Sequence, residues 1–301
     1  MQNEIKINDV TDTEFSKFRI SEKTQETLKK NNINSLFQIQ SATFDYLYDK
    51  NDLIGRDKTG SGKTLAFSLP ILERMRKNKQ FQENSSIRIL IMNPTRELVT
   101  QTKNNFDKLK NNPKEFSTLS VFGGSSIERQ ITSLEKGVDV LVATPGRLID
   151  LMERGHLDFS NLEVVIFDET DEMLKIGFQK DIEYIMKMIK KTRTNDIQYL
   201  MFSATVPKWV SGIAKDYMKK NHYFVNMVRD DVNQTVDTVE HLKLFTKDFR
   251  QKIEMISDFV SVYVGSTGRC IIFTNTKSNY WDFSFQILSI TYTFLKILYW
   301  C

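Results

Sequence analysis

With 301 residues, the chain is long enough to bury a large core, and its length is typical of about two domains. The hydrophobic fraction of 40% and the charged fraction of 27% exclude a disordered chain, and the two cysteines exclude a disulfide framework or a cysteine-rich zinc site. The formal net charge of +4 suits a nucleic-acid-binding protein, but it would equally suit many metabolic enzymes.

The N-terminal segment, residues 1–9, alternates polar and apolar residues and contains no continuous apolar stretch. A secretory signal requires such a stretch, so we expect no signal peptide. The two cysteines, Cys270 and Cys301, are compatible with a reducing compartment. The sequence therefore predicts an intracellular protein.

Short β-branched runs alternate along the chain with longer stretches that carry apolar residues at helical spacing. The predicted strands are residues 53–54, 87–92, 138–142, 164–167 and 199–202, and the predicted helices are residues 65–76, 96–110 and 178–190. Strands that are apolar throughout and separated by helices predict an α/β fold, in which helices cover both faces of a parallel sheet. Ligands of such sheets bind at the carboxyl ends of the strands.

Residues 229–238 are polar and lack periodicity, so we expect a linker there. After it, residues 240–244, 249–264 and 269–274 have the patterns of a strand, a helix and a strand. This order predicts the opening of a second α/β domain. The expected organisation is a first domain over residues 1–228, the linker over 229–238, the start of a second domain over 239–278, and an aromatic-rich tail over 279–301.

A glycine-containing loop lies between the first predicted strand and the first predicted helix. It reads Thr59-Gly60-Ser61-Gly62-Lys63-Thr64. Glycines at such a turn let backbone N–H groups approach phosphate oxygens, and the helix N-terminus adds a favourable dipole. Lys63 would reach the β- and γ-phosphates of a nucleoside triphosphate, and the Thr64 hydroxyl would bind Mg²⁺. A strict P-loop has glycine where this chain has Asp57, so an ordinary glycine turn is the alternative.

Two carboxylates follow another predicted strand. The apolar run at residues 164–167 leads directly into Asp168 and Glu169. Asp168 could hold Mg²⁺, directly or through water, and Glu169 could orient and deprotonate an attacking water. The alternative is an acidic helix cap. Together with the upstream phosphate loop, the pair predicts a nucleoside triphosphatase.

At this point the residues resemble the DEAD-box RNA helicases of superfamily 2, most of all the nucleolar Gu-type helicases. Asp168-Glu169-Thr170-Asp171 stands where that family has its name-giving tetrad, with Thr in place of Ala. Four further strings occur in the family's order: Pro94-Thr95-Arg96-Glu97-Leu98, Gly123-Gly124, Thr144-Pro145-Gly146-Arg147 and Ser203-Ala204-Thr205. The resemblance extends from about Glu14 to Lys277. It implies a RecA-like parallel sheet domain followed by an incomplete second RecA-like domain.

The resemblance also implies how adenine would bind. Gln40 is expected to read the adenine edge, and Phe15 is expected to stack on its face. A side-chain amide can pair with the donor and acceptor of adenine, which makes the first role chemically reasonable. Gln38 stands where the family usually has Pro, and Asn32 where it usually has Gly.

The remaining strings are expected to form an RNA track. Two of these strings supply Pro94, Thr95, Arg96, Thr144, Pro145, Gly146 and Arg147. Thr95-Arg96 and Thr144-Pro145-Gly146-Arg147 are expected to begin helices, where N–H groups and cations can hold successive phosphates. Gly123 and Gly124 would permit close approach of the RNA backbone. Such contacts bind RNA without reading its sequence. By resemblance, Asp171, Ser203 and Thr205 are expected to couple the nucleotide site to this track.

The second domain begins as the family's does, with Cys270-Ile271-Ile272-Phe273-Thr274-Asn275-Thr276-Lys277. In this family the second domain supplies arginines that stabilise the transferred phosphate, and no arginine follows Ser278 here. For the tail at residues 279–301 we prefer a shifted reading frame or retained intron, with membrane anchoring as the alternative.

The sequence as a whole predicts an ATP- and Mg²⁺-dependent RNA helicase that acts as a monomer, without a membrane partner. Turnover by this chain is expected to be impaired, because the arginine motifs are missing. The alternative is a non-catalytic module that binds ATP or ADP, with weak RNA binding. A nuclear or nucleolar location is expected from the Gu-type resemblance alone.

Overall fold

A computed structural model describes residues 4–6, 12–79, 81, 86–192, 196–228, 242–264, 270–274 and 295–299. The chain divides into two compact units, residues 1–234 and residues 235–301. The predicted linker at 229–238 lies outside the described residues, as do residues 239–241 and most of the tail. Among the described residues, no helix has both the length and the apolar character needed to cross a membrane.

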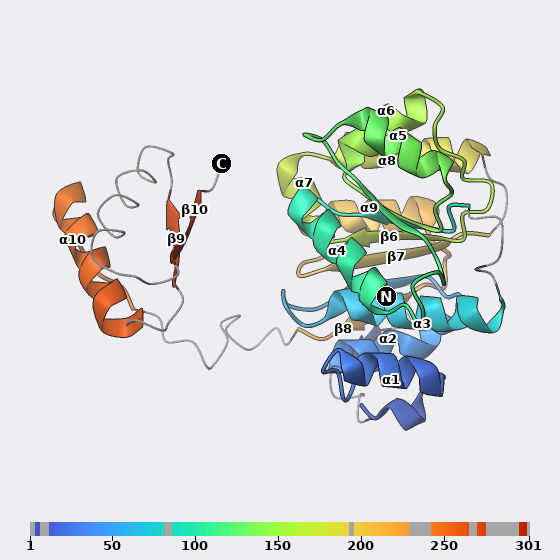
Figure 1. The fold of residues 1–301 in the computed structure, drawn as a ribbon, viewed down its shortest axis with the longest axis horizontal. Coiled ribbons are helices and arrows are strands. Elements are labelled where there is room, and N and C mark those ends of the chain that lie inside the picture. Colours follow the sequence, from blue (N-terminus) through green and yellow to red (C-terminus); the bar gives the residue numbers. More distant parts are fainter. Residues whose placement is uncertain are drawn as a thin grey trace. The chain divides into compact units, whose positions relative to one another are not determined.

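An eight-stranded parallel sheet forms the centre of the first unit (Figure 1). Its order is β1-β8-β2-β7-β6-β3-β5-β4, and every neighbouring pair is parallel. The strands are β1 Glu4–Lys6, β2 Leu53–Arg56, β3 Ile89–Met92, β4 Thr118–Val121, β5 Val140–Ala143, β6 Val164–Asp168, β7 Gln198–Ser203 and β8 Tyr223–Asn226. The predicted α/β fold with a parallel sheet is confirmed.

Helices cover both faces of this sheet. They are α1 Glu22–Lys30, α2 Gln38–Tyr48, α3 Lys63–Lys77, α4 Arg96–Lys108, α5 Ile127–Glu135, α6 Pro145–Glu153, α7 Thr170–Ile176, α8 Gln179–Thr192 and α9 Lys208–Tyr217, with a 3₁₀ turn, η2, at Phe15–Lys17. One apolar cluster joins α1 to α4 with the sheet, and a second joins α6 to α9 with the opposite face. Because neighbouring strand residues such as Val165 and Ile166 belong to different clusters, both faces of the sheet are buried.

The predicted elements are present with shifted ends, and several elements were not predicted. The strand expected at 87–92 begins at Ile89, and the helix expected at 96–110 ends at Lys108. The strands β1, β4 and β8 were missed. The first has three residues, and β4 is a partly exposed edge strand with polar residues at alternate positions, so neither has the apolar run on which the prediction relied.

The second unit contains α10 Phe249–Phe259, a π-helical turn at Val260–Val264, and the strands β9 Cys270–Thr274 and β10 Leu295–Tyr299. The two strands pair in parallel. The helix α10 and the strand β9 agree with the prediction, whereas β10 was not predicted. The strand expected at 240–244 is wrong over its described part, because residues 242–246 have no regular structure.

A close approach between two strands requires a glycine at position 55. Gly55 of β2 pairs with Phe202 of β7. A Cβ atom built on Gly55 would lie 2.6 Å from Cε1 of Phe202, which is inside any tolerable contact. The Phe202 ring itself is fully buried. The ring therefore occupies the space that a side chain at position 55 would need.

We predict that Gly55→Ala destabilises the fold by about 1–3 kcal/mol, because the core must shift to admit one methyl group. Urea unfolding measures the change. The control is Gly212→Ala in α9, where a Cβ would meet nothing within 4 Å. The control variant should be stabilised by about 0.5–1 kcal/mol through helix propensity. A Gly55→Ala protein as stable as the wild type would contradict the packing described.

Candidate nucleotide and RNA site

The predicted site residues lie at one edge of the sheet, because all the strands are parallel and each string follows the end of a strand. The phosphate loop follows β2, the Ser203 string begins at the last residue of β7, and the acidic tetrad begins at the last residue of β6. The other strings follow β3, β5 and β4. Since the strand order is β2-β7-β6-β3-β5-β4, the nucleotide strings occupy one half of the edge and the RNA strings the other.

Lys63 is the first residue of α3, and its side chain is buried. Its Nζ atom donates to the carbonyl oxygens of Asp57 at 3.1 Å and Lys58 at 3.0 Å, and it lies 3.4 Å from Oε1 of Glu169. The side chain of Asp57, where the strict loop pattern has glycine, accepts from the backbone N–H of Lys58 at 2.8 Å. The loop and the acidic pair therefore meet in space.

Asp168 ends β6 with a fully buried carboxyl group. Burial, followed by the neighbouring charge of Glu169, raises the pKa of Asp168 to about 7, although Lys63 and a hydrogen bond oppose the shift. That hydrogen bond comes from Nδ2 of Asn93, 3.2 Å from Oδ2 of Asp168. Asn93 directly follows the neighbouring strand β3 and is itself completely buried. It therefore links the two halves of the edge.

Glu169 is the N-cap of α7 and has left-handed backbone angles, φ 54° and ψ 51°. This conformation directs the chain sharply from β6 into α7. Thr170 stands where the resembled family has Ala. Its Oγ1 lies 3.2 Å from the carbonyl oxygens of both Phe167 and Phe202, so the hydroxyl can donate to either. The extra hydroxyl is therefore accommodated without an unpaired polar group.

The three residues expected to couple the site are in direct contact. Oγ of Ser203 accepts a hydrogen bond from the backbone N–H of Asp171 at 3.2 Å, and Thr205 donates to Oδ2 of Asp171 from its backbone at 3.2 Å and its hydroxyl at 3.0 Å. Burial alone would raise the pKa of Asp171, but the hydrogen bonds from Ser203 and Thr205 outweigh it and hold that pKa below its usual value. The tetrad and the segment after β7 thus form one hydrogen-bonded unit.

A cavity of about 400 Å³ extends from the phosphate loop and the acidic pair. Its walls include Gly60, Gly62, Lys63, Thr64, Asp168 and Glu169 at one end, and Asn31, Ile33, Ser35, Phe37, Leu98, Gln101, Asn105 and Lys108 toward the other. One end is thus polar and charged, and the other combines apolar side chains and amides with Ser35 and a single lysine, Lys108. This division suits a ligand with a phosphate end and a larger, partly apolar end.

Gln40 lies in the cavity wall and contacts the phosphate loop. Its Oε1 accepts from the backbone N–H of Phe37 at 2.8 Å, and its Nε2 donates to the carbonyl oxygen of Gly62 at 3.1 Å. Gly62 has φ 87°, and a Cβ there would lie 2.4 Å from Nε2 of Gln40 and 3.0 Å from the Phe37 ring. Only glycine admits this packing. To read adenine, Gln40 would have to exchange at least one of these bonds.

Phe15 is placed differently from the expectation. It is 5% exposed and belongs to the hydrophobic core, and it is absent from the residues that line the cavity. Phe37 instead presents a ring at the cavity, with 59% of its surface exposed. In this structure the aromatic group available for stacking is therefore Phe37. Neither Phe37 nor Asn93 was singled out from the sequence, because both follow from tertiary contacts rather than from a local motif.

The RNA strings lie at the ends of β3, β4 and β5. Thr95 is the N-cap of α4, and its hydroxyl accepts from the backbone N–H of Leu98 at 3.3 Å. Arg96 begins α4 and is exposed, with its Nε 2.8 Å from Glu97. Nη1 of Arg96 lies 3.6 Å from the point that a Cβ on Gly124 would occupy, and Gly124 has φ 84°. The string after β3 and the glycine pair after β4 are therefore adjacent.

The string after β5 is used partly for packing. Pro145 is the first residue of α6, and a Cβ on Gly146 would meet nothing within 4 Å. Nη1 of Arg147, however, donates to the carbonyl oxygen of Ser125 at 3.2 Å and to Oε1 of Gln130 at 2.9 Å. The guanidinium of Arg147 therefore connects α6 to α5, and 12% of the Arg147 side chain is exposed to solvent.

Comparison with known proteins identifies relatives for most of the chain. The family model of DEAD/DEAH box helicases matches residues 37–213. The chain is 40% identical over 267 residues to the ATP-dependent RNA helicase DDX50 of Mus musculus, which covers 88% of this chain and 36% of that protein. It is 38% identical to nucleolar RNA helicase 2 of Rattus norvegicus, with 88% and 34% covered. The chain thus spans about a third of the length of these curated relatives.

Solved structures share the fold. A DEAD box protein from Methanococcus jannaschii is 26% identical with a TM-score of 0.64, covering 92% of this chain and 70% of that chain. The DEAD-box helicase Mss116, solved with ssRNA and UDP-BeF, is 23% identical with a TM-score of 0.77, covering 90% and 57%. The parallel sheet therefore has the RecA-like arrangement of these neighbours.

The raised pKa of Asp168 generates a prediction about stability. Since the pKa of about 7 lies above the ordinary value of 3.8, the folded chain keeps a proton that the unfolded chain loses at intermediate pH. The free energy of unfolding then falls as pH rises through this window, and the loss is complete above the folded pKa. Asp168→Asn keeps the shape of the side chain and removes the charge.

We expect Asp168→Asn to melt about 3 °C or more above the wild type at pH 8, with a smaller advantage at pH 5. Differential scanning calorimetry at the two pH values measures this. Asp216→Asn, at an exposed position of α9, is the matched control and should change little at either pH. An equal advantage for Asp168→Asn at both pH values would contradict the burial of an ionised carboxylate.

Proposed function

The chain belongs to the DEAD/DEAH box helicase family, and from this premise we propose that it is the nucleotide-binding part of an ATP-dependent RNA helicase. Its activity would be RNA-stimulated ATP hydrolysis coupled to local separation of short duplexes. The observation that carries the proposal is the 3.4 Å contact between Nζ of Lys63 and Oε1 of Glu169. It supports a single site formed by the phosphate loop and the acidic pair.

Within this site, the residues of the loop from Thr59 to Thr64 would hold the phosphates of ATP. The first N–H groups of a helix have no intrahelical partner, so those at the start of α3 are suited to phosphate oxygens. Lys63 would exchange Glu169 for the phosphates, which would leave the Glu169 carboxylate to orient and accept a proton from water. Nucleotide binding would therefore free Glu169 from its ion pair with Lys63 and allow Glu169 to act as the base.

Thr64 and Asp168 are the proposed Mg²⁺ residues. Among the described residues, no group of three or more His, Cys, Asp or Glu side chains is arranged to hold a metal ion. The Thr64 hydroxyl and the Asp168 carboxylate are a donor set that fits Mg²⁺, which usually binds one or two protein oxygens together with phosphates and waters. When bound, Mg²⁺ would neutralise charge on the phosphates.

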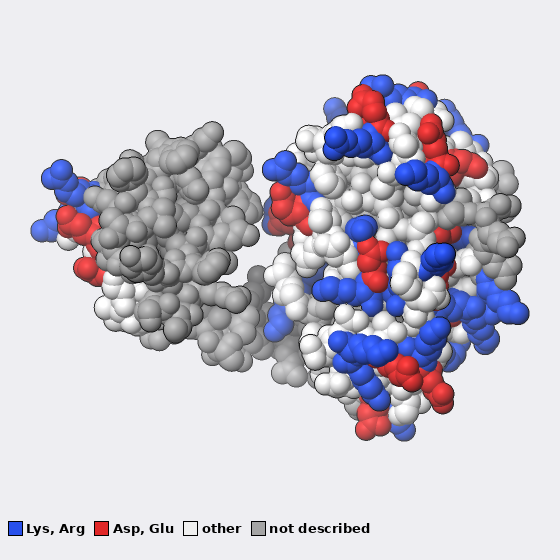
Figure 2. Space-filling view, viewed as in Figure 1, with Lys and Arg blue, Asp and Glu red and all other residues white. Residues whose placement is uncertain are grey.

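Adenine recognition by Gln40 remains part of the proposal, with Phe37 rather than the buried Phe15 as the stacking ring. For RNA, the proposed contacts are the N-terminus of α4, Arg96, the Gly123-Gly124 pair and the start of α6. On the face seen in Figure 2, basic and acidic side chains of the first unit are interspersed. Binding is therefore proposed to depend on this edge of the sheet rather than on a broad basic surface.

A second candidate is a module that binds nucleotide without turnover. The last arginine in the sequence is Arg269, so residues 270–301 contain no arginine that could stabilise a transferred phosphate. The proposed organisation is unchanged from the expectation: a first domain over residues 1–228, a linker over 229–238, the start of a second RecA-like domain over 239–278, and an aromatic-rich tail over 279–301. We propose weak or absent turnover for these 301 residues alone.

We further propose a monomer in the nucleus or nucleolus. The support for this location is that similar proteins are named nucleolar RNA helicases. Imaging of a fluorescent fusion tests the location, and an exclusively cytoplasmic signal would contradict it.

Two measurements test the function: phosphate release with and without single-stranded RNA, and nucleotide binding by calorimetry. Lys63→Ala should weaken ATP binding by at least about tenfold, since it removes the cation that faces the phosphates. Glu169→Gln should retain binding but lower any turnover by about 10²-fold or more. Binding of ATP without measurable turnover in the wild type favours the second candidate. Failure of the wild type to bind ATP at all would contradict both candidates.

RNA binding is tested through one exposed ion pair. Arg96→Gln should weaken binding to single-stranded RNA and make the slope of log affinity against log salt shallower by about 0.7, because one phosphate contact is lost. Glu97→Gln is the matched variant: it releases Arg96 from its partner and should strengthen binding. Fluorescence anisotropy at several salt concentrations measures both. If neither variant changes the affinity, Arg96 does not contact RNA.

A further inference from the structure

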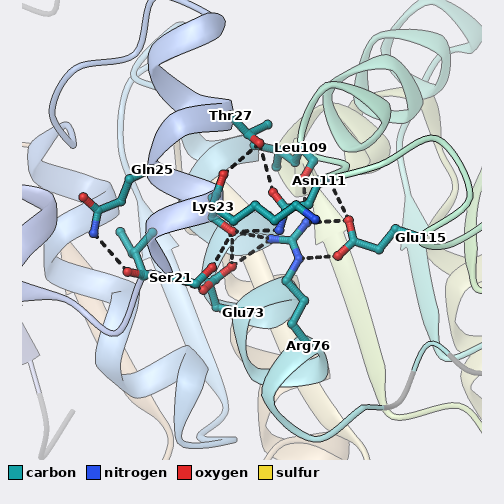
Figure 3. Close-up of polar contacts among 11 residues, drawn as sticks. Ser21, Lys23, Gln25, Thr27, Glu73, Arg76, Leu109, Asn111 and Glu115 are labelled. Atoms are coloured by element: carbon teal, nitrogen blue, oxygen red, sulfur yellow. Dashed lines mark hydrogen bonds and ion pairs between the residues drawn. The ribbon is translucent and has the colours of Figure 1, made fainter.

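A cluster of buried and partly buried polar side chains lies away from the phosphate loop, between α1, α3 and the segment after α4 (Figure 3). Its centre is Arg76, in the last turn of α3. Nε and Nη2 of Arg76 bind both carboxylate oxygens of Glu115, at 2.7 and 3.0 Å. Nη1 donates to Oε1 of Glu73 at 2.8 Å and to Oγ1 of Thr24 at 3.1 Å, and Nη2 donates to the carbonyl oxygen of Leu109 at 2.6 Å. Every N–H group of the guanidinium therefore has an acceptor.

The acceptors of Arg76 come from separate segments. Thr24 belongs to α1, whereas Leu109 and Glu115 belong to the segment that follows α4. Glu73 extends the connection, because its Oε2 accepts from the backbone N–H of Ser21, the N-cap of α1, at 2.7 Å. The Arg76 cluster therefore attaches the start of α1 to the end of α3.

Asn111 forms a second connection between the same segments. Its Nδ2 donates to Oγ1 of Thr24 at 3.2 Å, and its Oδ1 accepts from the hydroxyl of Thr27 at 2.9 Å. Its backbone N–H donates to Oε2 of Glu115 at 2.6 Å. One turn further along, Nδ2 of Asn31 donates to the carbonyl oxygen of Lys108 at 3.2 Å. A continuous set of hydrogen bonds thus joins α1 to the carboxyl end of α4.

Both of these segments are connected to residues that line the cavity. Helix α1 ends at Lys30 and leads directly into residues 31–37, which supply Asn31, Ile33, Ser35 and Phe37 to one wall. Helix α4 supplies Leu98, Gln101, Asn105 and Lys108. Residues 31–37 also carry Phe37, which contacts the phosphate loop beside Gln40. The cluster is therefore connected to both of the segments, residues 31–37 and α4, that line this part of the cavity.

We propose that the Arg76 cluster is a positioning site for the nucleoside end of a bound nucleotide, which holds residues 31–37 at a fixed place against α4. This role rests on the proposed nucleotide binding. No residue of the cluster belongs to the phosphate loop. The cluster should therefore affect binding of the nucleoside and leave binding of the phosphates unchanged. A purely structural cluster would instead affect both ends of the ligand alike.

The test compares ATP with inorganic tripolyphosphate, which carries the phosphates without the nucleoside, in calorimetric titrations of the whole chain with Mg²⁺. Asn111→Ala removes the side-chain bonds to α1 and spares those of Arg76. It should raise the dissociation constant for ATP about tenfold, or about 1.4 kcal/mol, and that for tripolyphosphate less than about twofold. Thr27→Val, which removes one of the same bonds with little change of shape, should act in the same direction with a smaller effect.

Two controls separate the outcomes. Asn104→Ala, at an exposed position of α4, should leave both constants unchanged, and Lys63→Ala should weaken both ligands. Thermal melting establishes that each variant is folded at the assay temperature. Equal weakening of ATP and tripolyphosphate by Asn111→Ala, or no weakening of either, overturns the positioning role while the proposed function stands. A wild type that binds neither ligand overturns the proposed function and the positioning role together.

Discussion

The parallel pairing of β6 with β7 on one side and with β3 on the other is the constraint on which the site depends. Because parallel strands end at the same edge, this pairing brings Oδ2 of Asp168 within 3.2 Å of Nδ2 of Asn93, the residue that follows β3. The same edge carries the loop after β2, so Lys63 reaches Glu169. A shift of one residue in the register of β6 would turn its buried side chains to the opposite faces and withdraw both carboxylates from the loop.

The charges at this edge are arranged with little water around them. Lys63 and Asp168 are each 4% exposed, so their charged forms lack most of the hydration that they would have in solution. The backbone oxygens of Asp57 and Lys58 and the carboxylate of Glu169 replace that hydration for Lys63, whereas Asp168 has fewer donors and a raised pKa. A divalent cation beside a bound phosphate would supply the positive charge that the ionised carboxyl group of Asp168 lacks. The electrostatic imbalance is therefore of the kind that a charged ligand relieves.

The parts of the site that are predictable from sequence are those encoded by contiguous residues. The loop at 59–64 and the pair at 168–169 each combine a strand, a turn and a helix start within a few positions, so their place at the sheet edge follows from local pattern and parallel topology. Phe15, Phe37 and Asn93 behave differently. Phe15 is buried because it packs into the core around α1 to α4, and Asn93 faces Asp168 because β3 and β6 are neighbours although 75 residues separate the two side chains. Strand order and side-chain packing of this kind are not local properties of the chain.

Glu169, in the turn between β6 and α7, has a left-handed backbone conformation. A φ of 54° is uncommon for any residue with a Cβ atom, and such a conformation costs roughly 1 kcal/mol or more relative to glycine. Glycine would relieve that strain, yet it would leave the edge of the sheet without its second carboxylate. The turn between β6 and α7 thus keeps a strained backbone conformation at the residue that carries the second carboxylate. Here glycine would suit the backbone better, whereas the proposed role as base requires the carboxylate of Glu169.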